Sequence, residues 1–291
     1  MTKSKAFSMP RVRFFAALLA IFAPVAFANT VASSTDSESV TVMVSTSKAY
    51  TTQLKRQLQL RYPAPVRIEQ VLADSFANSA LLLEKGQTSN DVGSNAKSKV
   101  EAIQSNDIYW LGAGLYTGFP HPDKALVINQ LEQLALQSNN NDKAIYIALS
   151  QALTQLTIGE RIFTPLDYDV VRITPSANPL VNQDVSLVLP KRPQSVYVLG
   201  AVAKPGDIPW QTRLNADGYI AHTQPSSLGD NSVATVIQPD GTVESHSIAY
   251  WNQNHQDIAP GAIVYLGFSS LPSGYRSLND EIINILRNRA L

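Results

Sequence analysis

The stretch Val196-Tyr-Val-Leu-Gly-Ala-Val-Ala-Lys-Pro-Gly-Asp-Ile-Pro-Trp210 predicts the fold more directly than any other part of the sequence. Its first residues alternate two sets of apolar or small side chains, as in a strand covered on both faces. Lys204–Asp207 interrupts this pattern, because Pro205 presets φ and Gly206 accepts a positive φ, and both favour a turn. Ile208-Pro-Trp210 then resumes an extended chain, so the stretch predicts a β-hairpin.

The residues that follow predict a further hairpin and the rest of a small sheet. Gly218–His222 is typical of a short helix, and Ser232–Ile237 and Thr242–Ile248 are typical of strands. Asp240-Gly241 lies between these two strands and is a preferred pair for a tight turn. Ala259–Phe268 is expected to contain the last strand, after a Pro-Gly turn.

The first 28 residues have the pattern of a secretory signal peptide. Four basic residues and no acidic ones precede an apolar run from Phe14 to Ala23, and Ala26 and Ala28 stand at the positions of a small-residue cleavage site. The run is about ten residues, well short of the roughly 20 that span a bilayer, so cleavage after Ala28 is favoured over a membrane anchor. We therefore expect a periplasmic chain with no transmembrane segment after cleavage.

Composition excludes several classes of function. The chain has 23 Lys and Arg and 23 Asp and Glu, and removal of the leader leaves 19 against 23, a net charge of −4. A chain without a basic stripe is not expected to bind nucleic acid. There is no Cys, so a lipoprotein anchor, disulfides and thiol nucleophiles are excluded.

Strand patterns also appear on both sides of a helical region in the first half. Ser39–Ser45 alternates as a strand, Tyr50–Leu60 fits a strand or a helix, and Val66–Leu72 has the spacing of a short helix. Gly86–Ser94 is polar and predicts a surface loop. Ile108–Gly118 contains Gly112 and Gly114, but Gly118 is one residue late for a nucleotide loop, so we expect a strand end and a close-packed loop, and no cofactor.

The helical region consists of two predicted helices, Asp123–Gln137 and Asn141–Thr157, which form an antiparallel hairpin. Asp123 is a candidate N-cap for the first, and Gly159 is a candidate C′ residue for the second. Short strands are expected again at Arg161–Phe163, Asp169–Ile173 and Asp184–Leu189. We therefore expect the helices of 123–157 to be inserted into a sheet that is formed by residues 39–110 and 160–189, with a boundary near Pro190–Pro193.

The C-terminal segment Ser277–Leu291 predicts an amphipathic helix. Ser277 is a candidate N-cap, and Asp280 three residues later imitates a capping box. Four residues at i, i+4, i+7 and i+8 form one apolar stripe: Leu278, Ile282, Ile285 and Leu286. The helix either folds back on its own domain or docks on a partner. We predict that deletion of 277–291 leaves a folded, soluble protein with impaired polysaccharide secretion.

Few residues have a pattern typical of catalysis. The four histidines have no metal-binding spacing and are expected on the surface or in turns: His121, His222, His246 and His255. Asp167-Tyr-Asp169 matches a three-residue motif of metal-dependent glycosyltransferases, but no nucleotide-sugar domain surrounds it, so two turn or strand-end carboxylates are favoured. Trp210, Tyr250 and Trp251 could stack on sugar rings, although buried anchors at strand ends are the commoner role.

From about Arg161 to Arg289 the chain resembles the GfcC family of capsule and exopolysaccharide accessory proteins. The stretches that show this resemblance, in their order, are DYDVVRITPSANPLV, RPQSVYVLGAVAKPGDIPW, VIQPDGTV, AYWNQNH, PGAIVYLGFSS and LPSGYRSLNDEI. The first hairpin is also similar to the opening of SLBB-type β-grasp modules of polysaccharide-export proteins.

The resemblance implies an α+β fold with two β-grasp (SLBB-like) domains, a helical hairpin inserted in the first, and a C-terminal amphipathic helix. The expected organisation is a signal peptide at 1–28, a first domain at 39–190 with an insert at about 120–158, a second domain at 194–270, and the helix at 277–291.

Two functions from different classes remain open. The first is a non-enzymatic accessory protein that binds polysaccharide or the export machinery of the envelope, and the resemblance favours it. The second is a polysaccharide-modifying hydrolase, which needs two carboxylates about 5–10 Å apart across a cleft. The resemblance also places Arg161 at the position of a cavity arginine, where a guanidinium could bind an acidic sugar. The alternative is a structural Arg161 paired with Asp167 or Asp169.

Overall fold

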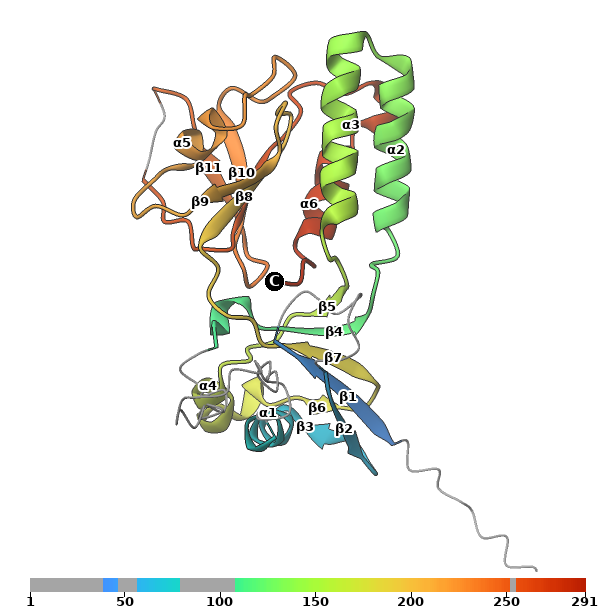
Figure 1. Cartoon of the computed structure of the whole chain (residues 1–291), viewed down its shortest axis with the longest axis vertical. Coiled ribbons are helices and arrows are strands. Elements are labelled where there is room, and N and C mark those ends of the chain that lie inside the picture. Colours follow the sequence, from blue (N-terminus) through green and yellow to red (C-terminus); the bar gives the residue numbers. More distant parts are fainter. Residues whose placement is uncertain (1–38, 47–56, 79–107, 252–254) are drawn as a thin grey trace, which may run out of the picture. The chain divides into compact units, whose positions relative to one another are not determined.

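The computed structural model describes residues 39–46, 57–78, 108–251 and 255–291. These residues form two five-stranded mixed sheets, a short two-stranded sheet and six α-helices (Figure 1). The predicted α+β class is therefore confirmed. The signal peptide predicted at 1–28 and the loop predicted at 86–94 lie outside the described residues.

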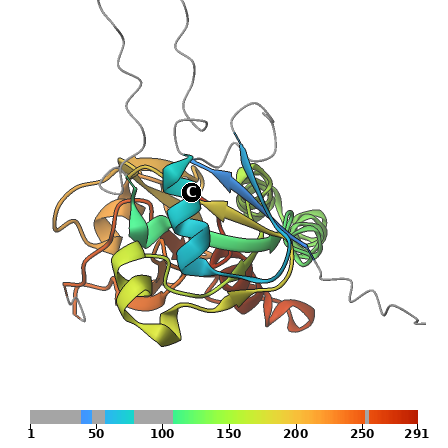
Figure 2. The ribbon, with the colours of Figure 1, turned by 90° about the horizontal axis from the view of Figure 1, so that it is seen from below.

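The first sheet has the strand order β2-β1-β7-β4-β5. β1 pairs antiparallel with β2 and parallel with β7, and β4 pairs antiparallel with both β7 and β5. Helix α1 (Ile68–Ala77) packs on one face of this sheet through apolar side chains that share a core with β1 and β7 (Figure 2). The strand bounds are β1 Val40–Ser45, β2 Leu58–Tyr62, β4 Gly114–Gly118, β5 Glu160–Ile162 and β7 Val185–Val188; β3 Val66–Arg67 and β6 Leu180–Val181 form the short sheet.

The second sheet has the order β9-β8-β12-β10-β11, and helix α5 (Ala216–Ala221) packs against it. Both hairpins predicted from the sequence are present, β8 with β9 and β10 with β11. The positive φ near the first hairpin belongs to Gly200, at +114°, and not to Gly206 as expected, because β8 ends where its chain passes the backbone of Leu266. The strand bounds are β8 Ser195–Gly200, β9 Gly206–Pro209, β10 Val233–Ile237, β11 Val243–Ser247 and β12 Ile263–Leu266.

The two sheets share one topology. In each, a hairpin comes first, a helix follows, and the last strand lies parallel to the first strand and between it and the third: β7 beside β1, and β12 beside β8. The third and fourth strands are then antiparallel neighbours in both sheets. The difference lies in their connection, which is the tight turn at Asp240-Gly241 in the second sheet and a helical hairpin in the first.

That helical hairpin consists of α2 (Lys124–Gln137) and α3 (Asn140–Gln155), which lie side by side (Figure 1). The side chain of Asn139 caps α3 by accepting from the backbone N–H groups of Asn141 and Asp142. As predicted, the pair is inserted between strands of the first sheet. Its apolar side chains, however, share a core with the second sheet, among them Val127, Leu131, Leu149 and Leu153.

The C-terminal helix α6 spans Leu278–Leu286 and is shorter than predicted. Its four stripe residues are 0 to 1 % exposed and lie in the core of the second sheet: Leu278, Ile282, Ile285 and Leu286. This burial favours the alternative in which the helix folds back on its own domain. The predicted capping box is not formed, because the Ser277 hydroxyl donates to Glu281 Oε1 instead of accepting from a backbone N–H.

After α6 the chain returns to the first sheet. The backbone N–H of Gly159 donates to the Asn288 carbonyl at 3.1 Å, and that of Ala290 donates to the Thr157 carbonyl at 2.9 Å. The Tyr116 hydroxyl of β4 donates to the Arg289 carbonyl at 2.9 Å. The last residues therefore bond to strands of one sheet, while the helix before them fills the core of the other.

Two local predictions are wrong, and a third, the N-cap position of Asp123, is right in position but lacks the side-chain bond. Asp169–Ile173 belongs to a helix, α4 (Tyr168–Ile173), because Asp167 accepts from the N–H groups of Asp169 and Val170 and so starts a helical turn. Gly159 is not a helix C′ residue, since α3 already ends at Gln155 with an extended cap. Asp123 precedes α2 but makes no capping hydrogen bond with its side chain.

Candidate functional site

A cavity of about 550 Å³ lies where four separate parts of the chain meet. They are the segment before β4, β5 with the loop after it, the β10–β11 turn, and the end of α6. The lining residues are Trp110, Leu111, Ala113, Arg161, Phe163, Thr164, Pro165, Leu166, Asp167, Asp240, Gly241, Thr242 and Arg287. This volume is within the range of about 300–1,000 Å³ that small-molecule sites occupy.

Arg161 occupies this cavity wall as a half-buried side chain of β5. Its Nη1 donates to the Pro239 carbonyl at 2.8 Å, and its Nη2 donates to the Ala113 carbonyl at 2.7 Å. These acceptors belong to the second and the first sheet respectively. Among the described residues, no acidic side chain pairs with Arg161, so the expected pairing with Asp167 or Asp169 is not found. Arg161 joins two backbone segments and leaves three of its five N–H donors for other partners.

Arg287 and Phe163 form a further part of the wall, beside Arg161. The Arg287 guanidinium lies 4.9 Å from the centre of the Phe163 ring, and its Nε donates to the Gly241 carbonyl at 3.0 Å. Phe163 is 51 % exposed, so part of its ring is open to solvent at the cavity. The Arg161 guanidinium also lies over this ring, at 5.8 Å. An exposed ring with two cations beside it offers both a stacking surface and positive charge.

The two carboxylates of the cavity are held by backbone groups. Asp167 caps α4, and Asp240 Oδ1 accepts from the backbone N–H of Thr242 at 2.9 Å. Each carboxylate has further lone pairs, which can accept from hydroxyl groups. The side chains of Thr164 and Thr242 add hydroxyl groups to the same wall. The cavity therefore combines hydrogen-bond donors and acceptors with an aromatic face.

A second cavity of about 600 Å³ adjoins the first. Both are lined by Leu111, Asp240 and Thr242, which are therefore common to the two. The second is further lined by Trp210, Thr212, Arg213, Gln238, Glu244, Asp257, Ile258 and Ala259.

The guanidinium of Arg192 lies over two aromatic rings near the shared wall. The Arg192 guanidinium lies 5.7 Å from the Tyr109 ring and 5.6 Å from the Trp210 ring, and the Trp210 indole N–H donates to the Ile258 carbonyl at 2.8 Å. Burial raises the pKa of the Tyr109 hydroxyl, which Arg192 partly opposes. Tyr109 therefore stays neutral at physiological pH, and Trp210 has a fixed orientation at the cavity.

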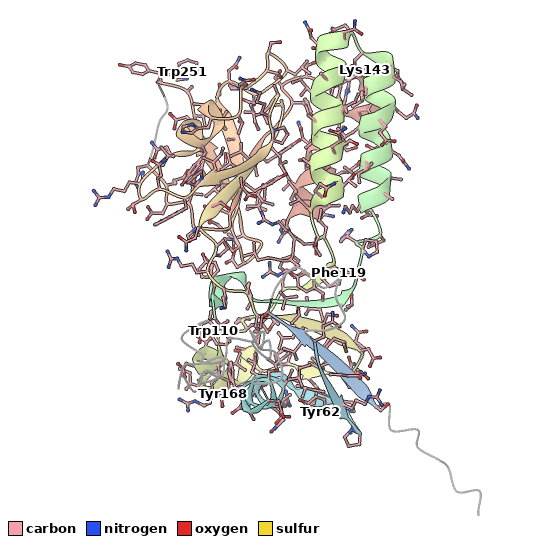
Figure 3. All side chains as sticks on the ribbon, in the orientation of Figure 1. Tyr62, Trp110, Phe119, Lys143, Tyr168 and Trp251 are labelled. Atoms are coloured by element: carbon pink, nitrogen blue, oxygen red, sulfur yellow. The ribbon has the colours of Figure 1, made fainter. Side chains whose placement is uncertain are left out.

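The candidate aromatics differ in their surroundings. Trp210 is the half-buried anchor that the commoner role predicts. Tyr250 and Trp251 are 93 % and 77 % exposed and are not buried anchors. Figure 3 shows Trp251 on the β11–β12 connection, pointing away from the sheet. Neither lines the two cavities described above.

The histidines have structural surroundings. His121 and His246 are buried, and each has a hydrogen-bond partner, the Asp123 N–H and the Glu244 carboxylate. His121 begins a turn, which is one of the expected positions, whereas His246 lies in strand β11 and is neither on the surface nor in a turn. In the described part of the chain, no group of three or more His, Cys, Asp or Glu side chains could hold a metal ion. None of the described helices combines the length and the apolar character needed to cross a membrane.

Of the predicted site residues, Arg161 lines the cavity and the α6 stripe is in the core. Sequence reasoning missed Arg287, Phe163 and the Asp240–Thr242 turn as cavity residues. The one available signal was that Arg287 lies at the end of the predicted helix, on a face other than the apolar stripe. No spacing rule relates that position to a turn more than 40 residues earlier.

Comparison with known proteins agrees with the resemblance seen in the sequence. A model described as "Capsule biosynthesis GfcC, N-terminal" matches residues 84–192, and "Capsule biosynthesis GfcC C-terminal" matches residues 204–290. The chain is also 28 % identical over 190 residues to "Uncharacterized protein YjbG" of Escherichia coli (strain K12), covering 62 % of this chain and 76 % of that protein. With both models matched in order along most of its length, the chain belongs to the GfcC capsule biosynthesis family.

Proposed function

We propose that this protein is a non-enzymatic accessory factor for capsule or exopolysaccharide assembly or export, and that it binds polysaccharide in the Arg161–Arg287 cavity. The family named for capsule biosynthesis supports the process. The observation on which the binding role depends is the exposed Phe163 ring with two guanidinium groups beside it and hydroxyl and carboxylate groups around it.

Sugars suit such a wall for physical reasons. Their C–H faces pack on aromatic rings, and their hydroxyl groups both donate and accept hydrogen bonds. Within the described ranges Arg287 donates through its Nε to Gly241, so its terminal N–H groups can bind a carboxylate or another anionic substituent through a planar fork. The same holds for the three donors that Arg161 does not use for the carbonyls of Ala113 and Pro239.

The location and domain organisation belong to the same proposal. The leader sequence supports a periplasmic protein with cleavage after Ala28. The shared topology of the two sheets supports two β-grasp domains, at 39–190 and 194–270. A partner in the export machinery could reach the α6 stripe only if α6 left the core in which it is buried. Glycan binding is therefore the more direct role.

A hydrolase remains the alternative, because Asp167 and Asp240 both line the cavity. Two considerations speak against it. Asp167 caps a helix and Asp240 orders a turn, so both have structural tasks that do not require catalysis. Incubation with the producing strain's own polysaccharide, followed by sizing of the products, separates the two functions. We expect the size distribution to stay unchanged.

The direct test is a binding titration of the purified chain with the producing strain's own polysaccharide. Replacement of Arg287 by Gln keeps one donor for the Gly241 carbonyl and removes the charge. We expect affinity to fall about tenfold, as for the loss of a charge-assisted hydrogen bond of ~1.5 kcal/mol. Arg172→Gln is the matched control, since this exposed arginine of α4 lies outside the cavity. Equal binding by all three proteins would overturn the proposal.

A further inference from the structure

We infer that the bound glycan is an extended chain which runs through both cavities, across the turn at Asp240–Thr242, rather than a single terminal sugar. This inference rests on the proposed glycan-binding function and adds the form of its ligand. The first cavity has a volume of about 550 Å³ and the second about 600 Å³. Leu111, Asp240 and Thr242 line both cavities, so the two are neighbours that share one wall.

The second cavity has the same combination of groups as the first. Trp210 supplies an aromatic ring whose orientation is fixed by its bond to the Ile258 carbonyl. Glu244 supplies a carboxylate that accepts from Gln238 Nε2 at 2.7 Å and lies 3.2 Å from His246 Nε2. A side chain held by two partners is preorganised, so it can accept from a sugar hydroxyl group without a further ordering cost.

The shared wall places polar groups between the two cavities. Thr242 and Asp240 can each bond to a sugar hydroxyl group on either side of the turn, as a chain crossing from one cavity to the other would require. A single sugar in one cavity would leave the ring and the ordered carboxylate of the other cavity facing water. Continuity of ring, hydroxyl and carboxylate groups therefore favours a chain of several sugars.

The two cavities differ in charge, and this difference sets the direction in which the glycan chain binds. The wall of the second cavity has three carboxylates, Asp240, Glu244 and Asp257, and one guanidinium, Arg213. The first cavity has two guanidinium groups to its two carboxylates. An acidic sugar would meet repulsion in the second cavity and attraction beside Arg287. The ligand is therefore a repeat with a neutral sugar on the Trp210 side and any anionic substituent on the Arg287 side.

The test uses size-fractionated fragments of the producing strain's polysaccharide, from one sugar up to about two repeats, titrated against the whole purified chain. We expect affinity to rise with fragment length by about tenfold or more, as one or two added hydrogen bonds imply, and then to level off. Arg213→Asn removes the guanidinium and suits the positive φ of +62° at this position, which Asn tolerates better than most residues.

Arg213→Asn should weaken binding of long fragments about fivefold and leave the shortest ones unchanged, whereas Arg287→Gln should weaken binding at every length. Arg172→Asn is the control for loss of a surface arginine. If short and long fragments bind equally to the unaltered chain, or if Arg213→Asn has no effect on long ones, the extended-chain inference is overturned while the binding function stands. If no fragment binds at any length, both fail.

Discussion

At the scale of single residues, Gly200 decides how the first hairpin leaves its strand. Its φ is +114°, and a Cβ at this position would lie 2.1 Å from the carbonyl oxygen of Leu266. We therefore expect Gly200→Ala to lower the free energy of unfolding by about 3 kcal/mol, since strain and overpacking each cost ~1–3 kcal/mol. Chemical denaturation measures this loss.

Gly206 provides the matched control six residues further along in the same hairpin. A Cβ there meets no atom within 4 Å, and its φ is not positive. Gly206→Ala should change stability by less than about 1 kcal/mol in either direction. Similar losses for the two variants would show that the close approach to Leu266 is not what requires glycine.

Arg161 should have a structural effect in addition to its proposed contact with a ligand. Its guanidinium joins the Ala113 and Pro239 carbonyls, one from each sheet. Arg161→Ala leaves both acceptors without this donor and should cost about 2 kcal/mol or more, while Arg161→Lys can restore one bond and should cost about half. Urea unfolding of the two variants beside Arg172→Ala checks the order. Unchanged stability in Arg161→Ala would mean that water replaces the guanidinium at no cost.

At the scale of elements, α6 is predicted to serve the core of its own chain. Ile285 is 1 % exposed and lies in the core of the second sheet, whereas Asn284 beside it is exposed. Ile285→Ala should therefore destabilise the protein by about 2–4 kcal/mol, and Asn284→Ala by much less.

For the same reason, deletion of 278–291 should give an unfolded or aggregated chain, in contrast to the outcome expected for a helix that docks on a partner. A folded, monomeric truncated protein would restore the partner-docking alternative.

The elements also show what the sequence could and could not predict. Strands β1 and β10 and helix α3 were predictable because their periodic apolar patterns agree with the side that is buried. Helix α2 was predictable as an element, but Leu126 and Leu136 of its apolar pattern are exposed. The helix α4 was not, because six residues with two adjacent valines fit a strand as well as a helix, and the Asp167 cap decides between them. The cavity could not be predicted beyond Arg161, because its wall depends on contacts between distant segments.

At the scale of the whole molecule, the order of elements along the chain differs from the order of cores in space. The hairpin α2–α3 is inserted between β4 and β5 of the first sheet but packs in the core of the second. The residues after α6 leave the second core and bond to β4 and to the segment before β5. The first half of the sequence thus supplies helices to the core of the second sheet, and the last residues of the second half bond to the first sheet. The cavity is lined by residues from both halves.

This exchange predicts a single cooperative unfolding transition for the two sheets. Opening the first sheet would free the ends of α2–α3, and opening the second would expose Leu131 and Leu149, which are fully buried in its core. Because neither sheet can unfold without removing buried apolar area from the other, we expect one calorimetric transition with equal calorimetric and van't Hoff enthalpies.

Tyr116→Phe removes the hydroxyl that donates to the Arg289 carbonyl and should lower the midpoint by a few degrees without splitting the transition. Hydrogen exchange should give similar opening free energies for the central strands β7 and β12. Two resolved transitions, or strands that exchange with clearly different free energies, would show that the sheets are independent units and that the shared core contributes little to either.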